Sequence, residues 1–179
     1  MTMFTDHTPE SAPPAARRSM TRVAGELGYV PAAVARIAAS PELLDGFLRL
    51  SGIFEGTSLD PLAREVVVMT VATRNGCRIC VAMHTARLTA LGADPAVITA
   101  LRAAAPLGEE RLEAVRVFTL RVLDTAGDVG DDALRGFLRA GYSSQNALEV
   151  VLGIGTYTMS TLANRMTGAP VDEQLSAFA

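Results

Sequence analysis

The 179-residue sequence contains no tryptophan, and aromatic residues make up only 5% of it. Hydrophobic residues nevertheless reach 49%, and alanine, leucine and valine are abundant. Such side chains suit closely packed helices better than a β-sandwich. The composition therefore predicts an all-α protein. A chain of this length is also expected to form one domain, since domains hold about 100 to 200 residues.

The sequence also lacks a concentration of positive charge and a long apolar run. Its net charge is -3, with both signs mixed along the chain, so nucleic acid is not an expected partner. The most apolar late segment, residues 147–163, contains Glu149 and several Thr, Ser and Gly residues. It is shorter than the run of about 20 apolar residues that spans a membrane. We therefore expect a core helix there and no membrane association.

Cysteine is scarce as well, because the chain contains only Cys77 and Cys80. Two cysteines do not make a disulfide scaffold, and their CxxC spacing is typical of a redox pair in a reducing compartment. Residues 1–18 carry acids and prolines without an apolar stretch, unlike a secretion signal. We therefore expect a cytoplasmic protein.

Residues 65–84, EVVVMTVATRNGCRICVAMH, hold most of the side chains that could carry chemistry. The spacing of Cys77, Cys80 and His84 covers about two helical turns, so the three side chains are expected on one face of a helix. The Asn-Gly dipeptide before the first cysteine favours positive φ and breaks a helix. Glu65 is therefore expected on one helix, and Cys77 is expected to begin the next.

These four residues together indicate thiol chemistry. A thiol at a helix N-terminus is stabilised as the thiolate, which favours Cys77 as a nucleophile. Cys80 is close enough to form a disulfide with it, and His84 could exchange protons with Cys80 one turn away. Glu65 could orient the imidazole and favour its protonated form. The sequence leaves open which sulfur attacks first, since helix-terminal placement favours Cys77 and adjacency to His84 favours Cys80.

The pattern E-x11-C-x2-C-x3-H resembles the signature of the alkylhydroperoxidase D (AhpD) branch of the carboxymuconolactone decarboxylase superfamily. The four positions are Glu65, Cys77, Cys80 and His84. The likeness covers roughly residues 30 to 173, with high specificity only in residues 65–84. Residues 64–92 resemble the family's core helical hairpin, residues 40–61 resemble its lead-in helix, and residues 164–173 show a weaker likeness. This chain departs from some peroxidase members, which have a second histidine near the cysteines where it has Arg78 and Ile79. The motif also lies before the midpoint of the chain rather than late in it.

The resemblance implies an AhpD-like helical bundle of about seven to nine helices, with a core helical hairpin that carries the CxxC motif. It implies a thiol-dependent hydroperoxide reductase or disulfide oxidoreductase, with Glu65, Cys77, Cys80 and His84 as its catalytic residues. It also implies a hydroperoxide or disulfide substrate, a dithiol reductant on a lipoyl or thioredoxin-like carrier, a peroxiredoxin as a further partner, and a homotrimer or hexamer. We expect no cofactor and no bound metal.

Other interpretations remain open. A cofactor-free lactone decarboxylase would not need the dithiol, and a non-catalytic oligomeric binding module could keep the motif without using it. A structural zinc site needs four ligands, so Cys77, Cys80 and His84 would need Glu65 or the distant His7 as the fourth. The cysteines could also be plain buried side chains. We expect His7 to be solvated and to have no role.

Residues that begin or end helices divide the rest of the chain into predicted segments. Residues 1–13 lack apolar periodicity and are expected to form a mobile arm or to wrap a neighbouring subunit, and residues 14–179 are expected to form the single domain. Asn164 and Arg165 are expected at the surface near a helix end, and Tyr157 and Met159 in the core. The predicted helices cover residues 14–27, 31–39, 41–55, 61–74, 77–91, 95–106, 109–126, 131–140 and 144–166.

Overall fold

The computed structural model describes residues 3–179, so Met1 and Thr2 of the predicted arm lie outside the described residues. Residues 3–179 form nine α-helices and a final 3₁₀ helix and contain no β-strand. The all-α prediction is confirmed. The helices are α1 (Pro14–Leu27), α2 (Ala32–Ile37), α3 (Pro41–Glu55), α4 (Pro61–Arg74), α5 (Arg78–Ala90), α6 (Pro95–Arg102), α7 (Glu110–Asp124), α8 (Asp131–Arg139), α9 (Ser144–Thr167) and η1 (Glu173–Phe178).

Side-chain caps explain why four of the nine α-helices in residues 3–179 begin where the sequence predicts. The N-cap side chains of α3, α4, α6 and α9 accept hydrogen bonds from backbone N–H groups of the first turn, and α9 has a full capping box. The prediction for α6 was too long at its end. Ala104 adopts a left-handed backbone with φ 54°, which stops the helix before Pro106. The short helix η1 was not predicted.

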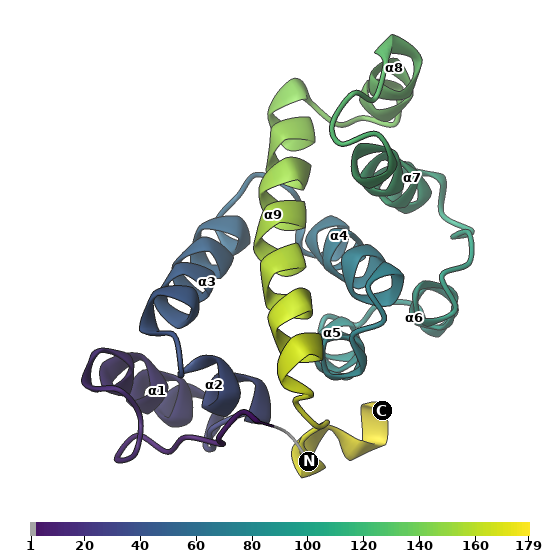
Figure 1. Cartoon of the computed structure of the whole chain (residues 1–179). Helices are drawn as coiled ribbons and strands as arrows, with labels where there is room; N and C mark the ends of the chain where they lie inside the picture. The colour runs from purple at the N-terminus through teal and green to yellow at the C-terminus, as the bar shows by residue number, and fades with distance from the viewer. Residues whose placement is uncertain (1–2) are drawn as a thin grey trace.

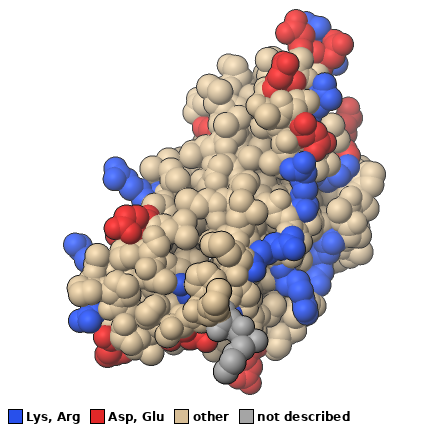
Figure 2. All heavy atoms as spheres, in the orientation of Figure 1, with Lys and Arg blue, Asp and Glu red and all other residues tan. Residues whose placement is uncertain are grey.

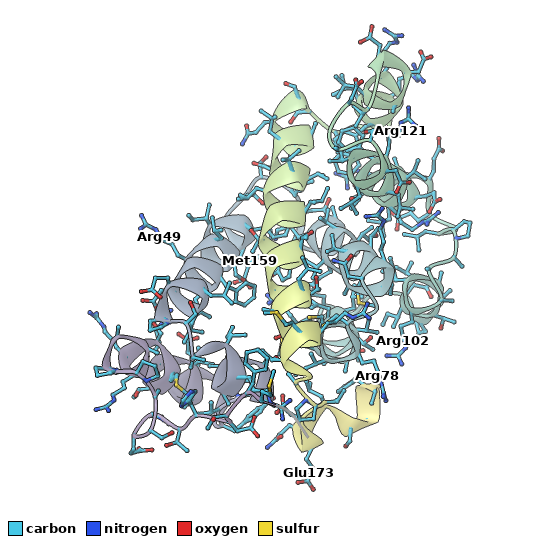
Figure 3. All side chains as sticks on the ribbon, viewed as in Figure 1. Arg49, Arg78, Arg102, Arg121, Met159 and Glu173 are labelled. Atoms are coloured by element: carbon cyan, nitrogen blue, oxygen red, sulfur yellow. The ribbon has the colours of Figure 1, made fainter. Side chains whose placement is uncertain are left out.

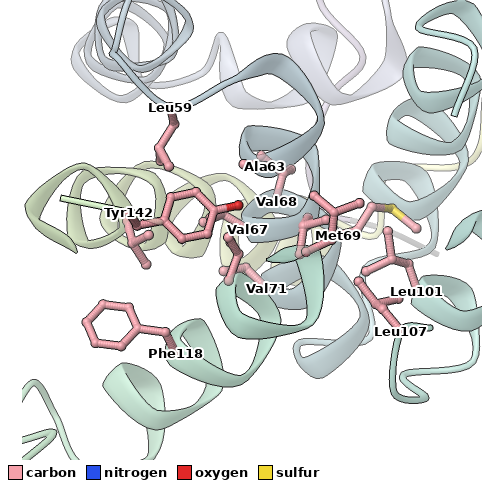
Figure 4. Close-up of a cluster of buried hydrophobic side chains, with 14 of the residues drawn as sticks. Leu59, Ala63, Val67, Val68, Met69, Val71, Leu101, Leu107, Phe118 and Tyr142 are labelled. Atoms are coloured by element: carbon pink, nitrogen blue, oxygen red, sulfur yellow. The ribbon is translucent and has the colours of Figure 1, made fainter. Parts of the chain in front are cut away.

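The longest helix, α9, runs through the middle of the molecule, with α1 to α3 on one side and α4 to α8 on the other (Figure 1). Its 24 residues make it about 36 Å long. On the second side, α4 packs against α5, α7 and α9. This arrangement buries residues 65–72 of α4 on every face rather than along a single stripe, which explains its run of valines (Figure 4). Buried residues around it include Val67, Val68, Met69, Val71, Leu101, Phe118 and Tyr142.

A close contact between the Gly153 backbone and two buried side chains fixes α9 against its neighbours. Gly153 is buried at the crossing of α9 with α3 and α4. A Cβ atom at this position would lie 2.7 Å from the ring of Phe54 and 3.0 Å from Cγ1 of Val67. Only glycine therefore lets the Phe54 ring and the Val67 side chain pack against α9 here without being displaced.

The described part of the N-terminal arm contacts α2. The His7 backbone N–H donates to the carbonyl oxygen of Ala35 at 3.1 Å, and Asp6 pairs with Arg36 at 2.6 Å. Ala12 is buried against the helices that follow. The predicted mobility of residues 1–13, and their contact with another subunit, stay predictions.

The outer face of α9 is apolar along its whole length. Leu148, Val151, Leu162 and Met166 are 72%, 48%, 55% and 70% exposed and follow one another at helical spacing. Figure 2 shows a broad area without charged residues on this side of the molecule. None of the helices within residues 3–179 is long and apolar enough to cross a membrane.

Candidate active site

The turn between α4 and α5 places the cysteines. Gly76 has φ 63°, and its N–H donates to the carbonyl of Thr73, while the Cys77 N–H donates to the carbonyl of Ala72. These two bonds form a Schellman motif, which requires a left-handed residue such as glycine. Cys77 is at the same time the N-cap of α5. The predicted helix break and helix start therefore share a single tight turn.

Residues from the end of α9 hold this turn from outside. Asn75 Nδ2 donates to Thr161 Oγ1 at 2.8 Å, and the Arg165 guanidinium donates to the Asn75 carbonyl oxygen. A Cβ on Gly76 would lie 3.0 Å from the Arg165 Nη1 atom. Arg165 is exposed, as expected. The position of the CxxC motif therefore depends on α9 as well as on its own helix.

The two sulfur atoms are buried and adjacent. Cys77 and Cys80 are 1% and 5% exposed, and their Sγ atoms lie 2.9 Å apart. Ala33, Ala72 and Ile79 pack around them and keep bulk water away. The CxxC motif thus forms a reduced dithiol in an apolar pocket.

The two thiols differ in acidity. A hydrogen bond from Cys80 lowers the pKa of Cys77 to about 7; burial opposes this, whereas the Cys80 backbone N–H, the Asn164 amide and the charge of Arg165 add to it. The same hydrogen bond, together with burial and the neighbouring charge, raises the pKa of Cys80 well above its ordinary value. Above about pH 7 the pair therefore carries one negative charge in most molecules, centred on Cys77.

Glu65 and His84 meet in the interior. Glu65 lies on α4 and His84 on α5, they are 5% and 3% exposed, and Glu65 Oε2 is 2.7 Å from His84 Nδ1. The carboxylate therefore fixes the ring so that Nε2 remains for other partners. The edge-on ring of Tyr157, centred 5.2 Å from the imidazole, adds a packing constraint.

A third group joins this pair and was not expected from the sequence. Arg87 Nε lies 3.3 Å from Glu65 Oε1, and its Nη2 atom lies 2.7 Å from Glu55 Oε1. Burial opposes the charge of Arg87, but the two carboxylates outweigh it and raise the pKa of the guanidinium. Glu65 thus has one partner in the core and one near the surface. Arg87 is one turn beyond His84 on α5, and this spacing is the signal that could have identified it.

A cavity of about 360 Å³ reaches these groups. Helices α1, α2, α3, α5 and α9 supply its walls, which are mostly apolar. Among the described residues, Cys80 lines this cavity and Cys77 does not. The polar groups at the inner end are Cys80, His84, Tyr157, Ser160 and Asn164.

The structure brings the four predicted site residues together as two pairs, Cys77–Cys80 and Glu65–His84, and Cys80 and His84 line the same cavity. It corrects the expectations for Met159 and Asn164. Met159, labelled on α9 in Figure 3, is only partly buried rather than in the core. Asn164 is 5% exposed rather than at the surface, and its Nδ2 atom donates to Cys80 Sγ at 3.3 Å. The sequence could not reveal this, because the contact joins residues 84 positions apart. His7 does not join these residues. It lies against α2, where its backbone N–H donates to the carbonyl oxygen of Ala35. Within residues 3–179, no three His, Cys, Asp or Glu side chains are arranged to hold a metal ion.

Comparison with known proteins supports the resemblance. The family model described as "Carboxymuconolactone decarboxylase family" matches residues 41–120, which include Glu65, Cys77, Cys80 and His84. No curated protein sequence matches the chain. The resemblance that the motif indicates is therefore confirmed over the region that holds the candidate site.

Solved structures of similar fold cover nearly the whole chain. The alkylhydroperoxidase AhpD core of an uncharacterized peroxidase-related protein from Ralstonia eutropha JMP134 has a TM-score of 0.85 and 18% identity, covering 97% of this chain and 94% of that chain. A peroxidase-related protein from Silicibacter sp. TM1040 has a TM-score of 0.77 and 19% identity, with coverages of 91% and 87%. A cysteine-to-alanine variant of the debrominase Bmp8, bound to 2,3,4-tribromopyrrole, has a TM-score of 0.79 and 15% identity, with coverages of 99% and 96%. These likenesses confirm the AhpD-like fold.

Proposed function

We propose that this chain, which has the AhpD fold and a match to the carboxymuconolactone decarboxylase family, is a thiol-dependent oxidoreductase that reduces an organic hydroperoxide or a disulfide. One observation carries the proposal: Cys80 of the dithiol and His84 of the buried Glu65–His84 pair line the same largely apolar cavity. A nucleophile, a proton donor and a group that orients the donor are the parts that such a reaction needs.

Cys80 is the sulfur that we propose to attack first. It lines the cavity, whereas Cys77 does not, although the resting negative charge favours Cys77. The two sulfurs are 2.9 Å apart, so one proton can move between them and transfer the charge to Cys80. A small population of the Cys80 thiolate is sufficient, because the substrate removes it by reaction.

The proposed reaction then follows in two steps. The Cys80 thiolate attacks the terminal oxygen of the hydroperoxide, an S–O bond forms as the O–O bond breaks, and the leaving alkoxide takes a proton from the His84 imidazolium. Cys77 attacks the resulting sulfenic acid, the S–O bond breaks, and hydroxide leaves as water after taking the Cys77 proton. The products are an alcohol, water and the Cys77–Cys80 disulfide.

A dithiol must then reduce the disulfide by exchange. Both sulfurs are nearly inaccessible from the outer surface, so the cavity is the available route for the reductant. A slender dithiol such as a lipoyl arm fits this route better than a rigid thioredoxin-like surface. A peroxiredoxin partner, like the cytoplasmic location expected from the sequence, stays a prediction.

The test is the consumption of cumene hydroperoxide by the purified protein with dihydrolipoamide as reductant. We expect turnover above the protein-free rate, and loss of steady-state turnover in Cys80→Ser and in Cys77→Ser. Cys77→Ser should still complete one reaction per subunit, because Cys80 keeps its access to the cavity. Full turnover in Cys80→Ser would contradict the dithiol mechanism.

Lactone decarboxylation remains the main alternative within the family, and it needs no dithiol. A variant with both Cys77→Ser and Cys80→Ser separates the two functions. If that double variant decarboxylates a carboxymuconolactone as fast as the wild-type protein, and the wild-type protein consumes no hydroperoxide, the family's eponymous reaction replaces our proposal. A dithiol that never forms a disulfide during exposure to substrate, together with no decarboxylation, would favour the non-catalytic binding module.

Reductive dehalogenation is a second candidate, which the debrominase of the same fold favours. The dithiol could supply two electrons to a bromoarene and give the arene, bromide, a proton and the disulfide. The apolar cavity of about 360 Å³ has room for such a ring. Bromide release from 2,3,4-tribromopyrrole in the presence of dihydrolipoamide tests this candidate directly.

We also propose that the chain assembles into a homotrimer or hexamer. The apolar outer face of α9 supports this proposal, since exposed patches of this kind often mark subunit interfaces. Sedimentation or light scattering of the wild-type protein gives the number of subunits.

A further inference from the structure

The Asn164 side chain lies at the inner end of the cavity, beside the sulfur that faces it. It is 5% exposed and comes from α9, one turn after Ser160. Its Nδ2 atom donates to Cys80 Sγ at 3.3 Å and to Ser160 Oγ at 3.5 Å. Both amide hydrogens are thus used inside the protein, and these two contacts set the orientation of the amide group.

The other half of the amide is unsatisfied. Asn164 Oδ1 is buried and has no hydrogen-bond partner, although an amide oxygen can accept two hydrogen bonds. A buried acceptor without a partner is unfavourable and rare in folded proteins. Because Asn164 and Cys80 line the same cavity, a donor that reaches the sulfur comes close enough to satisfy this oxygen.

On the basis of the proposed hydroperoxide chemistry, we propose that Asn164 is a catalytic residue with two roles. Its Nδ2–H group stabilises the thiolate on Cys80, and its Oδ1 atom accepts the O–H of the organic hydroperoxide. The first role acts on the sulfur and the second on the terminal peroxide oxygen, which are the two reacting atoms. The assignment also defines a substrate class: an apolar molecule whose reacting oxygen carries a hydrogen.

The first role follows from how the dithiol shares its charge. Arg165 and the N-cap position favour negative charge on Cys77, whereas the Ser160 side chain favours it on Cys80. Asn164 lowers the pKa of both thiols, but the sulfur that its Nδ2 atom contacts in the structure is that of Cys80, at 3.3 Å. Cys80 is the sulfur that lines the cavity. The Asn164 amide therefore increases the fraction of thiolate on the sulfur that a substrate can reach.

The second role persists through the reaction. When the Cys80 thiolate bonds to the terminal oxygen and the O–O bond breaks, that oxygen keeps its hydrogen and becomes the O–H of the sulfenic acid. The leaving alkoxide takes its proton from His84. Oδ1 of Asn164 can therefore hold the same O–H group before and after the electron pair moves, and release it when Cys77 displaces the hydroxide.

The test compares two reagents in a Cys77→Ser background, where Cys80 reacts once and cannot be resolved. Cumene hydroperoxide carries the O–H donor, whereas methyl methanethiosulfonate modifies the same sulfur without any hydrogen-bond donor. In Asn164→Leu, which keeps the branched shape of the side chain but replaces both polar atoms with methyl groups, we expect slower reaction with both reagents. The loss with the hydroperoxide should be at least about fivefold larger, as for one lost hydrogen bond.

Met83→Leu is the matched control, because Met83 also lines the cavity but has no polar atom on the sulfur. It should change the two rates alike. Asn164→Ser, a smaller polar change, serves if the leucine variant does not fold, and circular dichroism distinguishes these cases.

A second measurement needs no turnover. Cumyl alcohol, which carries an O–H group, should protect Cys80 of the wild-type protein from the thiosulfonate better than cumyl methyl ether does. We expect this preference to disappear in Asn164→Leu and to remain in Met83→Leu.

The possible outcomes separate this inference from the proposed function. Equal losses with both reagents, and equal protection by alcohol and ether, would overturn the role of Oδ1. Unchanged rates in Asn164→Leu would overturn the inference as a whole. If the Cys77→Ser protein forms no sulfenic acid with hydroperoxide at all, the proposed function itself fails.

Discussion

His84 Nδ1 and Glu65 Oε2 lie 2.7 Å apart in the interior, although the two residues come from different helices. Glu65→Gln keeps a polar group at this place but removes the charge that supports an imidazolium. We expect the peroxidase kcat/KM to fall about 10² to 10³-fold, as for loss of assisted proton transfer. Initial rates with cumene hydroperoxide measure the effect.

Glu55→Gln is the matched control for this prediction. Glu55 also pairs with Arg87, but it lies at the exposed end of the same chain of charges. We expect less than about a threefold change, because exposed ion pairs contribute little. Equal losses in the two variants would show that Arg87, rather than the charge beside His84, sets the rate.

The lowered pKa of Cys77 predicts a titration near neutral pH. The reduced protein should gain thiolate absorbance at 240 nm with a midpoint near pH 7, since the pKa of this thiol is about 7. Cys80→Ala removes the largest cause, the hydrogen bond from Cys80, and should move the midpoint upward. Cys77→Ala should show no step near pH 7, and a step that survives there would assign the titration to another group.

The same pKa sets how the stability of the reduced protein varies with pH. Below about pH 7 the Cys77 thiol is protonated in both the folded and the unfolded chain, so its acidity adds nothing. Above pH 7 the folded state releases the proton first, because the ordinary pKa of the thiol is 9.0. We therefore expect the contribution of Cys77 to the free energy of unfolding to grow between about pH 7 and 9. Urea denaturation of the reduced protein and of Cys77→Ala at several pH values isolates this contribution.

Two glycines of α9 provide a paired test of packing. A Cβ at Gly153 would overlap Phe54, whereas a Cβ at Gly155 would meet no atom within 4 Å. We expect Gly153→Ala to lower the free energy of unfolding by about 1–3 kcal/mol through overpacking. Gly155→Ala should raise it by about 0.5–1 kcal/mol, because alanine is the better helix former. Urea denaturation of both variants checks the opposite signs, and two changes of the same sign would contradict the close helix approach.

The apolar outer face of α9 predicts how assembly can be broken. In the double variant Leu148→Glu and Leu162→Glu, two buried charges would oppose any interface formed there. We expect light scattering to report a smaller assembly than for the wild-type protein. Val117→Glu changes an equally exposed apolar side chain on α7 and should leave the mass unchanged. An unaltered mass in the α9 variant would place the interface elsewhere.

Much of the fold could be predicted because its boundaries are local. Helix ends depend on short-range signals such as the Asp60–Pro61 start and the Gly76 break, and these follow from backbone chemistry. The full burial of α4 could not be predicted, because it depends on three helices that pack on it from different directions. A pattern along one helix does not reveal how many neighbours surround it.

In the candidate site, too, local features could be predicted from the sequence, whereas contacts between distant helices could not. The four residues of the motif could be identified from their spacing, since Cys77, Cys80 and His84 share one helix. Asn164 could not be placed, because its contact with Cys80 depends on where α9 passes α5. Its polarity and its position near a helix end suggested solvent, and tertiary packing overrode both signals.

The inner and outer faces of helix α9 have different roles. Its inner face supplies Tyr157, Ser160 and Asn164 to the wall of the cavity, and its outer face presents the apolar stripe. Because Gly153 allows α9 to pack tightly against α3 and α4, we expect α9 to move as one rigid helix. A displacement of its outer face would then also displace the residues on its inner face. In the proposed assembly, an interface on the outer face would therefore be coupled to the cavity on the inner face, and we expect dilution of the oligomer to change KM.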